Sequence, residues 1–275
     1  MKKRFASFLL LAGSATGLHA TAISVDLGSA DSFAVLAGTT VTNSGPSTIN
    51  GDLGVWPGTA VTGFPPGIVT TGTIHAGDTF AHQAQTDLTT AYNFAAGEAC
   101  PAGNVLSGDI GGMTLTPGVY CSTSSLAITG TLTLNALGDP NAVFVIQMVS
   151  SLTTATNSSV VITNGGTGDS VFWQVGSSAG IGTGSAFAGN ILALTSITMG
   201  TGASINCGRA LARNGDVTLL TNNISIDTTG CEAGVTTSGV PEPASLVLSG
   251  FGLLGLMLVA HRWQSTRTLR KTSAV

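Results

Sequence analysis

The stretch GIGTGSAFAGNILALTSITMGTGASINCGRALA, residues 180–212, decides the fold class because it repeats itself. The phrase GTG occurs at 182–184 and again at 200–202, so that Thr183 aligns with Thr201. A short repeat of this kind, with glycines at the ends of apolar segments, is typical of the coils of a solenoid. With three sides to a coil, each side would be a strand of about six residues. The stretch therefore predicts a three-sided β-solenoid and an all-β fold.

Segments on both sides of this stretch continue the repeat. LTTATNSSV, from Leu152, aligns with AGIGTGSAF, and VTLLTNNIS, from Val217, aligns with ITMGTGASI. Near the start of the chain, TTVTNSGPSTINGDLGV (39–55) aligns with TSITMGTGASINCGRALA (195–212) after one gap. We therefore expect an early segment to form a coil like the late ones. Alternation along two strands predicts inward side chains at Val171, Trp173 and Val175 and, less regularly, at Val143, Val145 and Met148.

One segment has helical rather than strand periodicity. AGDTFAHQAQTDLTTAYNFAAG, residues 76–97, begins near a capping residue, Asp78, and ends at Gly97. Its small apolar stripe consists of Phe80, Ala84, Leu88, Ala91 and Ala95. A helix over 77–96 would span about 27 Å, the height of five or six coils. We expect it to lie along one side of the solenoid and to return the chain so that later coils can stack.

The aligned coils place small polar side chains in two files on one predicted outward face. The first file contains Thr156, Thr183, Thr201 and Thr221. The second, two residues further along each coil, contains Ser158, Ser185, Ala203 and Asn223, and Ser204 lies next to it. The coils would be spaced about 4.8 Å apart, and the stiff χ1 of threonine would hold the grid still. Such a flat surface of hydroxyl and methyl groups can order water, but it lacks the concave shape that most ligands need.

The same pattern also has a purely structural interpretation. Threonine favours strands whatever their function. Ladders of Thr and Ser would therefore also be expected in a solenoid that has a structural or adhesive role. The residues alone leave both interpretations open.

The charge balance excludes several classes of partner. Between residues 21 and 239, two arginines, Arg209 and Arg213, stand against twelve acidic residues, a net charge of −10. This excludes a nucleic-acid-binding protein and argues against acidic membrane surfaces. Charged residues make up 8% of the chain, against about 25% in a typical soluble protein. Because hydrophobic residues make up 43%, the chain should nevertheless fold.

Residues that could catalyse a reaction are scattered. The histidines between 21 and 239 are His75 and His82, both beside the predicted helix, and most acidic residues have the Gly or Asn neighbours of turn residues. We therefore predict no enzyme, no catalytic residue, no metal site and no cofactor. The alternative is a carbohydrate-active enzyme with a solenoid fold, in which paired carboxylates would hydrolyse sugars.

Both ends of the chain have the composition of targeting segments. Residues 1–20 combine a basic start, an apolar run and a small-residue cleavage site, and are predicted to be a signal peptide. Residues 240–275 contain Pro241-Glu242-Pro243, an apolar run over 246–260 and a basic end, and they resemble a PEP-CTERM sorting signal. The resemblance implies a short transmembrane segment and cleavage by an exosortase. The folded domain is therefore expected over residues 21–239.

The chain contains four cysteines, Cys100, Cys121, Cys207 and Cys231. An even number in an exported protein favours disulfides, and three pairings are possible. We favour Cys100–Cys121 and Cys207–Cys231, because each pair closes a local loop.

Residues 26–232 resemble the DUF3494 ice-binding proteins of cold-adapted microbes. The matching stretches are LGSADSFAVLAGTTVTNSGPSTINGDLGVWPG, AVTGFPPG, AQTDLTTAYN, GGMTLTPGVYC, GDPNAVFVIQ and VFWQVGSSA, followed by the GTG coils. The resemblance implies a discontinuous right-handed three-sided β-helix with one long α-helix packed alongside. It also implies adsorption to ice through a flat face that often carries Thr-Ala/Gly-x-Thr/Asn phrases. TGSA and TGAS match these phrases in part, since Ala186 and Ser204 stand where Thr or Asn is usual.

The sequence thus predicts an exported, non-enzymatic protein that adsorbs to ice or ordered water through a Thr/Ser/Ala/Gly face and inhibits ice growth or recrystallisation. Its processing partners would be signal peptidase and exosortase. It would be secreted or held in a Gram-negative cell envelope by its C-terminal segment. The alternative is a structural or adhesive protein of the envelope or exopolysaccharide matrix, which would bind extracellular polysaccharide.

Overall fold

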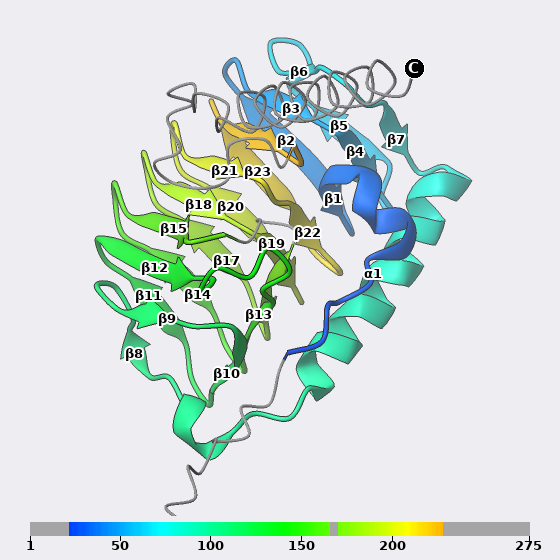
Figure 1. Ribbon diagram of the computed structural model, residues 1–275. Coiled ribbons are helices and arrows are strands. Elements are labelled where there is room, and N and C mark those ends of the chain that lie inside the picture. The colour runs from blue at the N-terminus through cyan, green and yellow to red at the C-terminus, as the bar shows by residue number, and fades with distance from the viewer. Residues whose placement is uncertain (1–21, 166–169, 228–275) are drawn as a thin grey trace, which may run out of the picture. The chain divides into compact units, whose positions relative to one another are not determined.

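The described chain is a stack of coils with three sides. The computed structural model describes residues 22–165 and 170–227, all within the compact unit Met1–Ala233. Its strands form three parallel eight-stranded sheets, here named A, B and C, and each complete coil contributes one strand to each sheet (Figure 1). The predicted all-β, three-sided β-helix is confirmed.

Sheet A is the side that carries the helix. Its strands, in spatial order, are β10 (Gly118–Ser122), β13 (Phe144–Met148), β16 (Val171–Val175), β19 (Asn190–Ala193), β22 (Ala210–Ala212), β1 (Phe33–Ala37), β4 (Asp52–Val55) and β7 (Ile74–Ala76).

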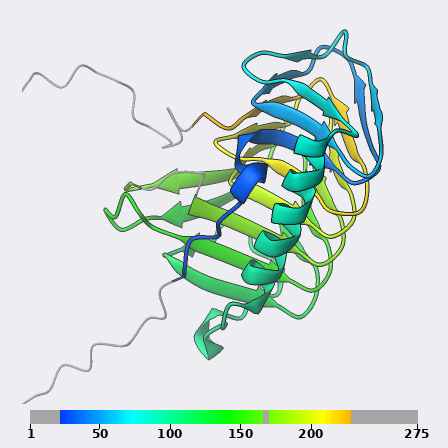
Figure 2. The same cartoon turned by 90° about the vertical axis from the view of Figure 1, so that its right-hand side faces the viewer.

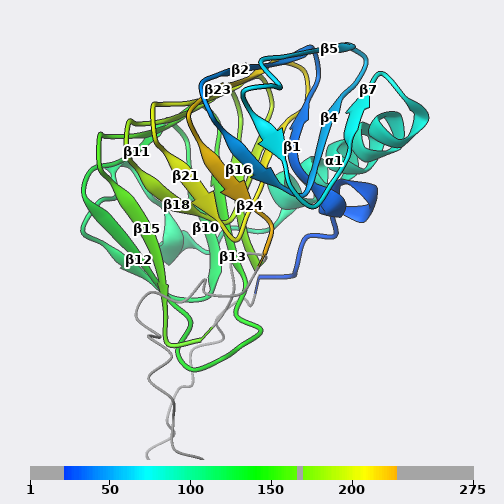
Figure 3. The ribbon, with the colours of Figure 1, turned by 90° about the horizontal axis from the view of Figure 1, so that it is seen from above.

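Sheets B and C form the other two sides. The strands of sheet B, in spatial order, are β5 (Ala60–Thr62), β2 (Thr40–Ser44), β23 (Val217–Leu220), β20 (Ile197–Met199), β17 (Ala179–Ile181), β14 (Leu152–Thr154), β11 (Leu126–Ile128) and β8 (Gly108–Asp109). Those of sheet C are β6 (Ile68–Val69), β3 (Thr48–Asn50), β24 (Asn223–Ser225), β21 (Ser204–Asn206), β18 (Ala186–Ala188), β15 (Ser159–Thr163), β12 (Thr131–Asn135) and β9 (Thr114–Leu115). Figure 3 shows β12, β15, β18, β21 and β24 side by side.

The coil order is discontinuous in the sequence. The N-terminal strands β1, β2 and β3 pair with β22, β23 and β24, which come last along the described chain. In Figure 1 the blue and cyan strands accordingly stack on the yellow and orange ones at one end. The chain then returns through the helix to the opposite end, where β8–β10 begin the second run of coils. This confirms the expectation that an early segment forms a coil like the late ones.

The helix α1 (Thr79–Gly97) runs across the outer surface of sheet A (Figure 2). It buries Ala84, Leu88, Ala91 and Ala95, as the apolar stripe predicted. Small side chains let the helix lie close to the sheet. The prediction was wrong for Phe80, which is 39% exposed, because the first turn of the helix extends beyond the centre of the sheet, beside β7 and His75.

Removing the helix cap should weaken this end of the fold. Asp78 Oδ1 accepts the Ala81 N–H at 2.9 Å, and this bond, together with weaker contacts to His75, holds the pKa of Asp78 below its ordinary value. We expect Asp78→Ala to cost about 1 kcal/mol at neutral pH. Because the folded pKa is lowered, the contribution exists above the unfolded pKa and is lost as the pH falls through the folded one.

Urea denaturation of both proteins at neutral pH and at about pH 3 checks this prediction. The difference between wild type and Asp78→Ala should narrow in acid. Asp78→Asn keeps a capping oxygen and should lose less stability than Asp78→Ala. A difference that is unchanged by pH would contradict the assigned role of the carboxylate.

Sheet A has apolar residues on both faces. Val171, Trp173 and Val175 point into the solenoid, as predicted, whereas Phe172 packs toward the helix. In and just before β13 the predicted phase was wrong for Val143 and Val145, because both pack with the helix-side cluster. The inward residues of that strand are Phe144, Ile146 and Met148. A strand that is buried on both sides shows no polar alternation from which its phase could be derived.

Disulfides and two short 3-10 helices complete the described fold. Cys100 and Cys121 form a disulfide, as predicted, and join the segment after α1 to β10. Cys207 is also disulfide-bonded, and its predicted partner, Cys231, lies outside the described residues. The short 3-10 helices η1 (Gly28–Ser32) and η2 (Ala102–Asn104) precede β1 and β8.

Candidate functional site

Two of the three sides are not covered by the helix. The outer faces of sheets B and C are both open, but their borders differ. Sheet C is followed by a long connection at 136–143, where Leu137 is 64% exposed. Sheet B is bounded by connections of a few residues, such as 194–196 before β20 and 200–203 after it. The outer face of sheet B, named face B below, is therefore bordered by shorter connections than that of sheet C.

A file of outward side chains runs along the middle of face B. Strand register places its members opposite one another in neighbouring coils. In spatial order this central file is Thr62, Thr42, Thr218, Thr198, Gly180, Thr153, Ala127 and Asp109. Each threonine is at least partly exposed, while the strand neighbours of all but Thr62, such as Ile197 and Met199, are buried. Four threonines thus stand in adjacent coils, spaced about 4.8 Å apart.

A row of serines borders the central file on the side of sheet A. In spatial order this serine row is Ser125, Ser151, Ser178 and Ser196, and Asp216 continues it. The amide that follows each serine donates to the carbonyl of the next member of the row at 2.9–3.2 Å. The side chains of Ser125 and Ser151 also bond to each other at 2.9 Å. The row adds fixed hydroxyl groups along the edge of face B.

The first predicted file lies at the corner between sheets B and C rather than on a strand. Thr156, Thr183 and Thr201 are exposed there. Each of them is followed by the corner residue, which has a positive φ. Thr221 was placed wrongly by one residue. Its amide bonds to Ser44 O, whereas Leu220 O accepts from Gly202. The corner of that coil is one residue shorter, so Thr221 itself adopts a φ of 57°.

The second predicted file does not face outward, and this prediction was wrong. Ser158 and Ser185 are 2% exposed and Ala203 is 0% exposed. Strand alternation does not continue through a corner, because the left-handed residue there reverses the side on which the next side chain stands. Asn223 and Ser204 do face solvent, but they lie opposite each other in sheet C.

The buried corner residues hold the coils together instead. Ser158 Oγ donates to Ile128 O at 2.9 Å, and Ser185 Oγ donates to Ala155 O at 2.8 Å. In the next coils Ala203 and Asn222 occupy the same place, and Asn222 Nδ2 donates to Gly200 O at 2.8 Å. These bonds satisfy backbone groups of neighbouring corners. The corner that displays the threonines is therefore rigid.

Truncating Asn222 should show how much the corner depends on such bonds. Asn222 Nδ2 also reaches Ala203 O at 2.9 Å, and Oδ1 accepts the Leu220 N–H. Asn222→Ala removes the side-chain partner of Ala203 O and of the Leu220 N–H, whereas Gly200 O still accepts the Ala203 N–H at 3.0 Å. We expect a loss of about 2–3 kcal/mol. Thermal unfolding followed by circular dichroism should show a midpoint lower by about 5–10 °C. Asn223→Ala is the matched control, because that side chain is exposed, and an equal loss in both variants would contradict the assignment.

The central file was missed in the sequence, although a signal for it exists. Ile197-Thr198-Met199 and Val217-Thr218-Leu219 each alternate apolar, Thr, apolar, which is typical of a strand with one buried face. The GTG phrases drew attention to the corners instead. The residues predicted from the sequence thus lie at the corner between sheets B and C or in sheet C, beside the central file and not in it.

Charge is nearly absent from face B. Among the described residues, its strands and serine row carry only Asp109 and Asp216. Hydrogen bonds lower the pKa of each carboxylate, chiefly from the Gly111 N–H to Asp109 and from the Ser196 hydroxyl to Asp216. The other described acids lie on the helix side or in loops: Asp26, Asp31, Asp52, Asp78, Asp87, Glu98, Asp139 and Asp227. The described acids therefore lie mainly outside face B.

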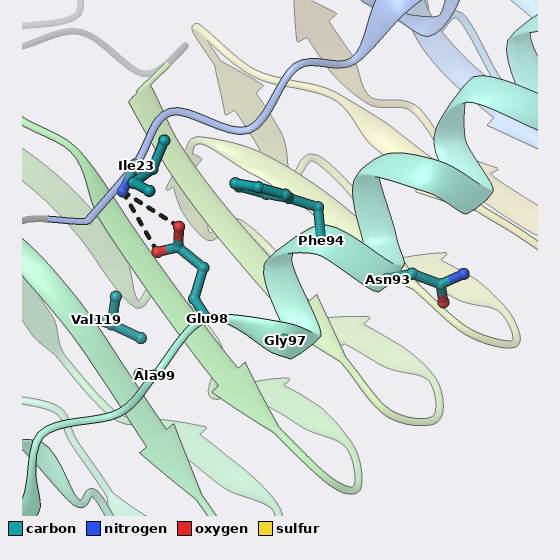
Figure 4. A pocket seen from close by; sticks show the side chains of 7 residues that line it. All are labelled: Ile23, Asn93, Phe94, Gly97, Glu98, Ala99 and Val119. Atoms are coloured by element: carbon teal, nitrogen blue, oxygen red, sulfur yellow. Dashed lines mark hydrogen bonds between the residues drawn. The ribbon is translucent and has the colours of Figure 1, made fainter.

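A pocket on the helix side has a different character (Figure 4). It is lined mainly by Ile23, Phe94 and Val119, with Glu98 between them. Both Glu98 carboxylate oxygens lie 3.3 Å from the Ile23 N–H that they accept. Burial raises the pKa of Glu98, although this hydrogen bond opposes the shift. The contacts show that the pocket is a packing site for the N-terminal segment, remote from face B.

The candidate catalytic groups do not converge. His75 Nδ1 lies 2.7 Å from Asp78 Oδ2 at the helix cap, and the His82 ring packs against Trp56 with centroids 4.6 Å apart. Gly176–Gly180 has the G-x-S-x-G spacing of a nucleophile elbow. Its Ser178, however, lies in the serine row between two strands, not between a strand and a helix. Within residues 22–165 and 170–227, no group of three metal-ligating side chains is found.

No helix within the described ranges is both long and apolar enough to cross a membrane. The predicted segment over 246–260 lies outside those ranges, as do the predicted signal peptide and sorting motif.

Comparison with known proteins assigns the family. A family model described as ice-binding-like matches residues 35–225, which include nearly all the strands described above. The chain belongs to the ice-binding-like family. An ice-binding protein of Nostoc sp. (strain HG1) is 54% identical to this family member over 250 residues, which cover 90% of each chain. A second model, for the PEP-CTERM protein-sorting motif, matches residues 239–262.

Solved structures of ice-binding proteins share the fold of this family member. One, from an Antarctic biological consortium, superposes with a TM-score of 0.72 at 52% identity, covering 74% of this chain and 92% of that one. Another, from the Antarctic ascomycete Antarctomyces psychrotrophicus, has a TM-score of 0.72 at 40% identity and covers 74% and 99% of the two chains. The resemblance to ice-binding proteins predicted from the sequence is thus confirmed.

Proposed function

We propose that this protein adsorbs to ice through face B, together with the exposed threonines at the corner between sheets B and C. One observation carries the proposal: four threonines in adjacent coils, Thr62, Thr42, Thr218 and Thr198, form an uninterrupted file on a flat, uncovered face. Relatives with the same fold are named ice-binding proteins. The ligand is the ordered water of an ice surface.

The mechanism is adsorption without a chemical step. Each threonine offers a methyl group and a hydroxyl group at a fixed place, since its β-branched side chain is restricted at χ1. Water that bonds to the hydroxyls between the methyl groups is held in rows that the coil spacing dictates. When these rows merge with the ice lattice, the bound protein pins the growing surface. Rigidity keeps the entropic cost of binding low, so many weak contacts suffice.

Face B suits this role better than the outer face of sheet C. The outward residues of sheet C vary in size and polarity, from Ala186 to Asn206 and the half-exposed Ile68. The long connection at 136–143 also borders sheet C. On face B the small side chains and short corners leave a plane that a flat crystal surface can approach.

Ice recrystallisation inhibition and thermal hysteresis, measured with the purified protein at micromolar concentration, test the proposal. Inhibited recrystallisation and shaped ice crystals are expected. Normal ice growth would overturn the proposal and favour an envelope or matrix protein. In that case binding to extracellular polysaccharide, measured by co-sedimentation, would be the activity of the same fold.

The targeting segments extend the proposal to location. We propose that signal peptidase removes residues 1–20 and that an exosortase cleaves near Pro241-Glu242-Pro243. The domain over 21–239 would then be released or held in the envelope of a Gram-negative cell. The match to a PEP-CTERM sorting motif over 239–262 supports this route. Mass spectrometry of the exported protein would show both new ends.

A further inference from the structure

The serine row at the edge of face B continues into one carboxylate, Asp216. It continues the serine row at the start of β23 and is half-buried between the coils of β20 and β2. A carboxylate is an unexpected group on a surface that must match ordered water, because a free charge binds water in its own geometry. Its contacts explain why it is tolerated there.

Asp216 accepts hydrogen bonds from two hydroxyl groups. Ser196 Oγ, in the neighbouring coil, donates to Asp216 Oδ1 at 2.6 Å. Thr218 Oγ1, two residues further along β23, donates to Asp216 Oδ2 at 3.0 Å. The Asp216 N–H in turn lies 3.3 Å from Ser196 Oγ. Both carboxylate oxygens are thus engaged by side chains of face B itself.

These bonds distinguish Thr218 from the other threonines of the central file. No hydrogen bond from the hydroxyl groups of Thr42, Thr62, Thr153 or Thr198 is found within the described ranges. A hydroxyl has one hydrogen to donate and two lone pairs. Because Thr218 and Ser196 each give their hydrogen to Asp216, their oxygens can present only lone pairs to water. The same bond fixes the direction of the Thr218 methyl group.

We propose that Asp216 is a positioning residue of the ice-adsorbing face, which turns the hydroxyl hydrogens of Ser196 and Thr218 inward so that both oxygens act only as acceptors toward water. The inference rests on the function proposed for face B. In the central file, the Thr218 hydroxyl would then have a fixed direction, whereas the hydroxyls of the neighbouring threonines can rotate. The fixed hydroxyls of Ser196 and Thr218 would set the hydrogen-bond direction of the first bound waters, and the other hydroxyls would align with those waters.

The coils next to Asp216 present uncharged side chains to its carboxylate. The neighbouring coils face it with Ser196 and Thr40, neither of which carries charge. The nearest cation along the chain is Arg213, whose guanidinium carbon lies 4.8 Å above the Tyr92 ring. The Ser196 hydroxyl, followed by that of Thr218, lowers the pKa of Asp216 although burial opposes this. In sufficiently strong acid the carboxyl gains its own hydrogen, and the two hydroxyls lose their common acceptor.

Asp216→Asn and Asp26→Asn form a matched pair that tests the proposal. Both substitutions remove one negative charge at nearly constant shape, but only Asp216 belongs to face B. Asp26 lies on the helix side, where its Oδ1 accepts the Gly28 N–H at 2.9 Å. The amide introduced by Asp216→Asn would donate as well as accept, so at least one hydroxyl must reverse. Thermal hysteresis of the full chain, at neutral pH and at about pH 3, is the readout, with circular dichroism as a check on folding.

We expect Asp216→Asn to lower thermal hysteresis to roughly half or less, and Asp26→Asn to leave it unchanged. In acid, wild type should fall toward the level of Asp216→Asn, while that variant changes little. Equal activity of wild type and Asp216→Asn at both pH values would overturn the positioning role. Should the variant unfold, an acid-insensitive wild type would overturn the role on its own. A wild type that is inactive at every pH would instead refute the proposed function itself.

Discussion

Thr198→Tyr is expected to abolish the inhibition of ice growth while leaving the fold intact. Thr198 stands in the centre of face B, between Thr218 and Gly180 in the adjacent coils. Its side chain is exposed, so a tyrosine meets no steric conflict in the protein. The ring would rise above the plane and hold the remaining threonines away from the ice surface. We expect thermal hysteresis to fall by about tenfold or more.

Asn206→Tyr is the control for this experiment. Asn206 belongs to β21 of the same coil and is exposed on sheet C. The variant introduces the same ring at the same height of the solenoid, but on the side that we do not assign to ice. It should retain wild-type thermal hysteresis. If Asn206→Tyr loses activity and Thr198→Tyr keeps it, the ice-adsorbing face is sheet C.

Arg209→Ala is expected to be the most destabilising substitution of a charged residue. The side chain of Arg209 is 4% exposed, and its Nη2 lies 2.8 Å from Asp31 Oδ1. Its Nε donates to Asp31 O at 2.9 Å, and its Nη1 donates to Asn190 Oδ1 at 2.8 Å. One guanidinium thus ties η1 to two coils from the other end of the chain. Its loss leaves a cavity and unpaired acceptors, at a cost of about 3 kcal/mol.

Arg213→Ala supplies the comparison, because these are the two arginines between residues 21 and 239. The Arg213 guanidinium lies over the Tyr92 ring, and its Nε has no hydrogen-bond partner. We expect a loss of about 1 kcal/mol from this contact. Urea denaturation gives both values. Similar losses in the two variants would show that Arg209 does not act as the link between the chain ends.

Much of the fold could be predicted from the sequence because each coil repeats the same requirements. The alignment of Leu152 with Ala179 and of Ile197 with Val217 is reproduced in the strand register. Helix α1 was predicted within two residues at its start and one at its end, since a capping Asp78 and a terminal Gly97 mark it. Local signals of this kind act within a few residues and do not depend on distant packing.

The positions of the site residues were harder to derive because the corners break the strand period. Gly184, Gly202 and Thr221 have φ values of 65°, 69° and 57°, and each turns the following side chain to the other side. A rule of two residues per repeat cannot be carried across such a point. Thr201 and Ala203 were therefore assigned to one face, although the structure places one outside and the other inside. The corner at Thr221 is shorter by one residue, and the amino-acid composition gives no sign of this difference.

The discontinuous coil order has a consequence for export. A chain that crosses a membrane unfolded, N-terminus first, delivers β1–β3 at the beginning, but their partners β22–β24 arrive near the end. The first coils therefore remain without neighbours on one edge until almost the whole domain has emerged. Thr42 and Thr218, adjacent in the finished file, are separated by most of the chain. Face B is thus completed only when the last strands pair with the first, so a partial chain cannot form it.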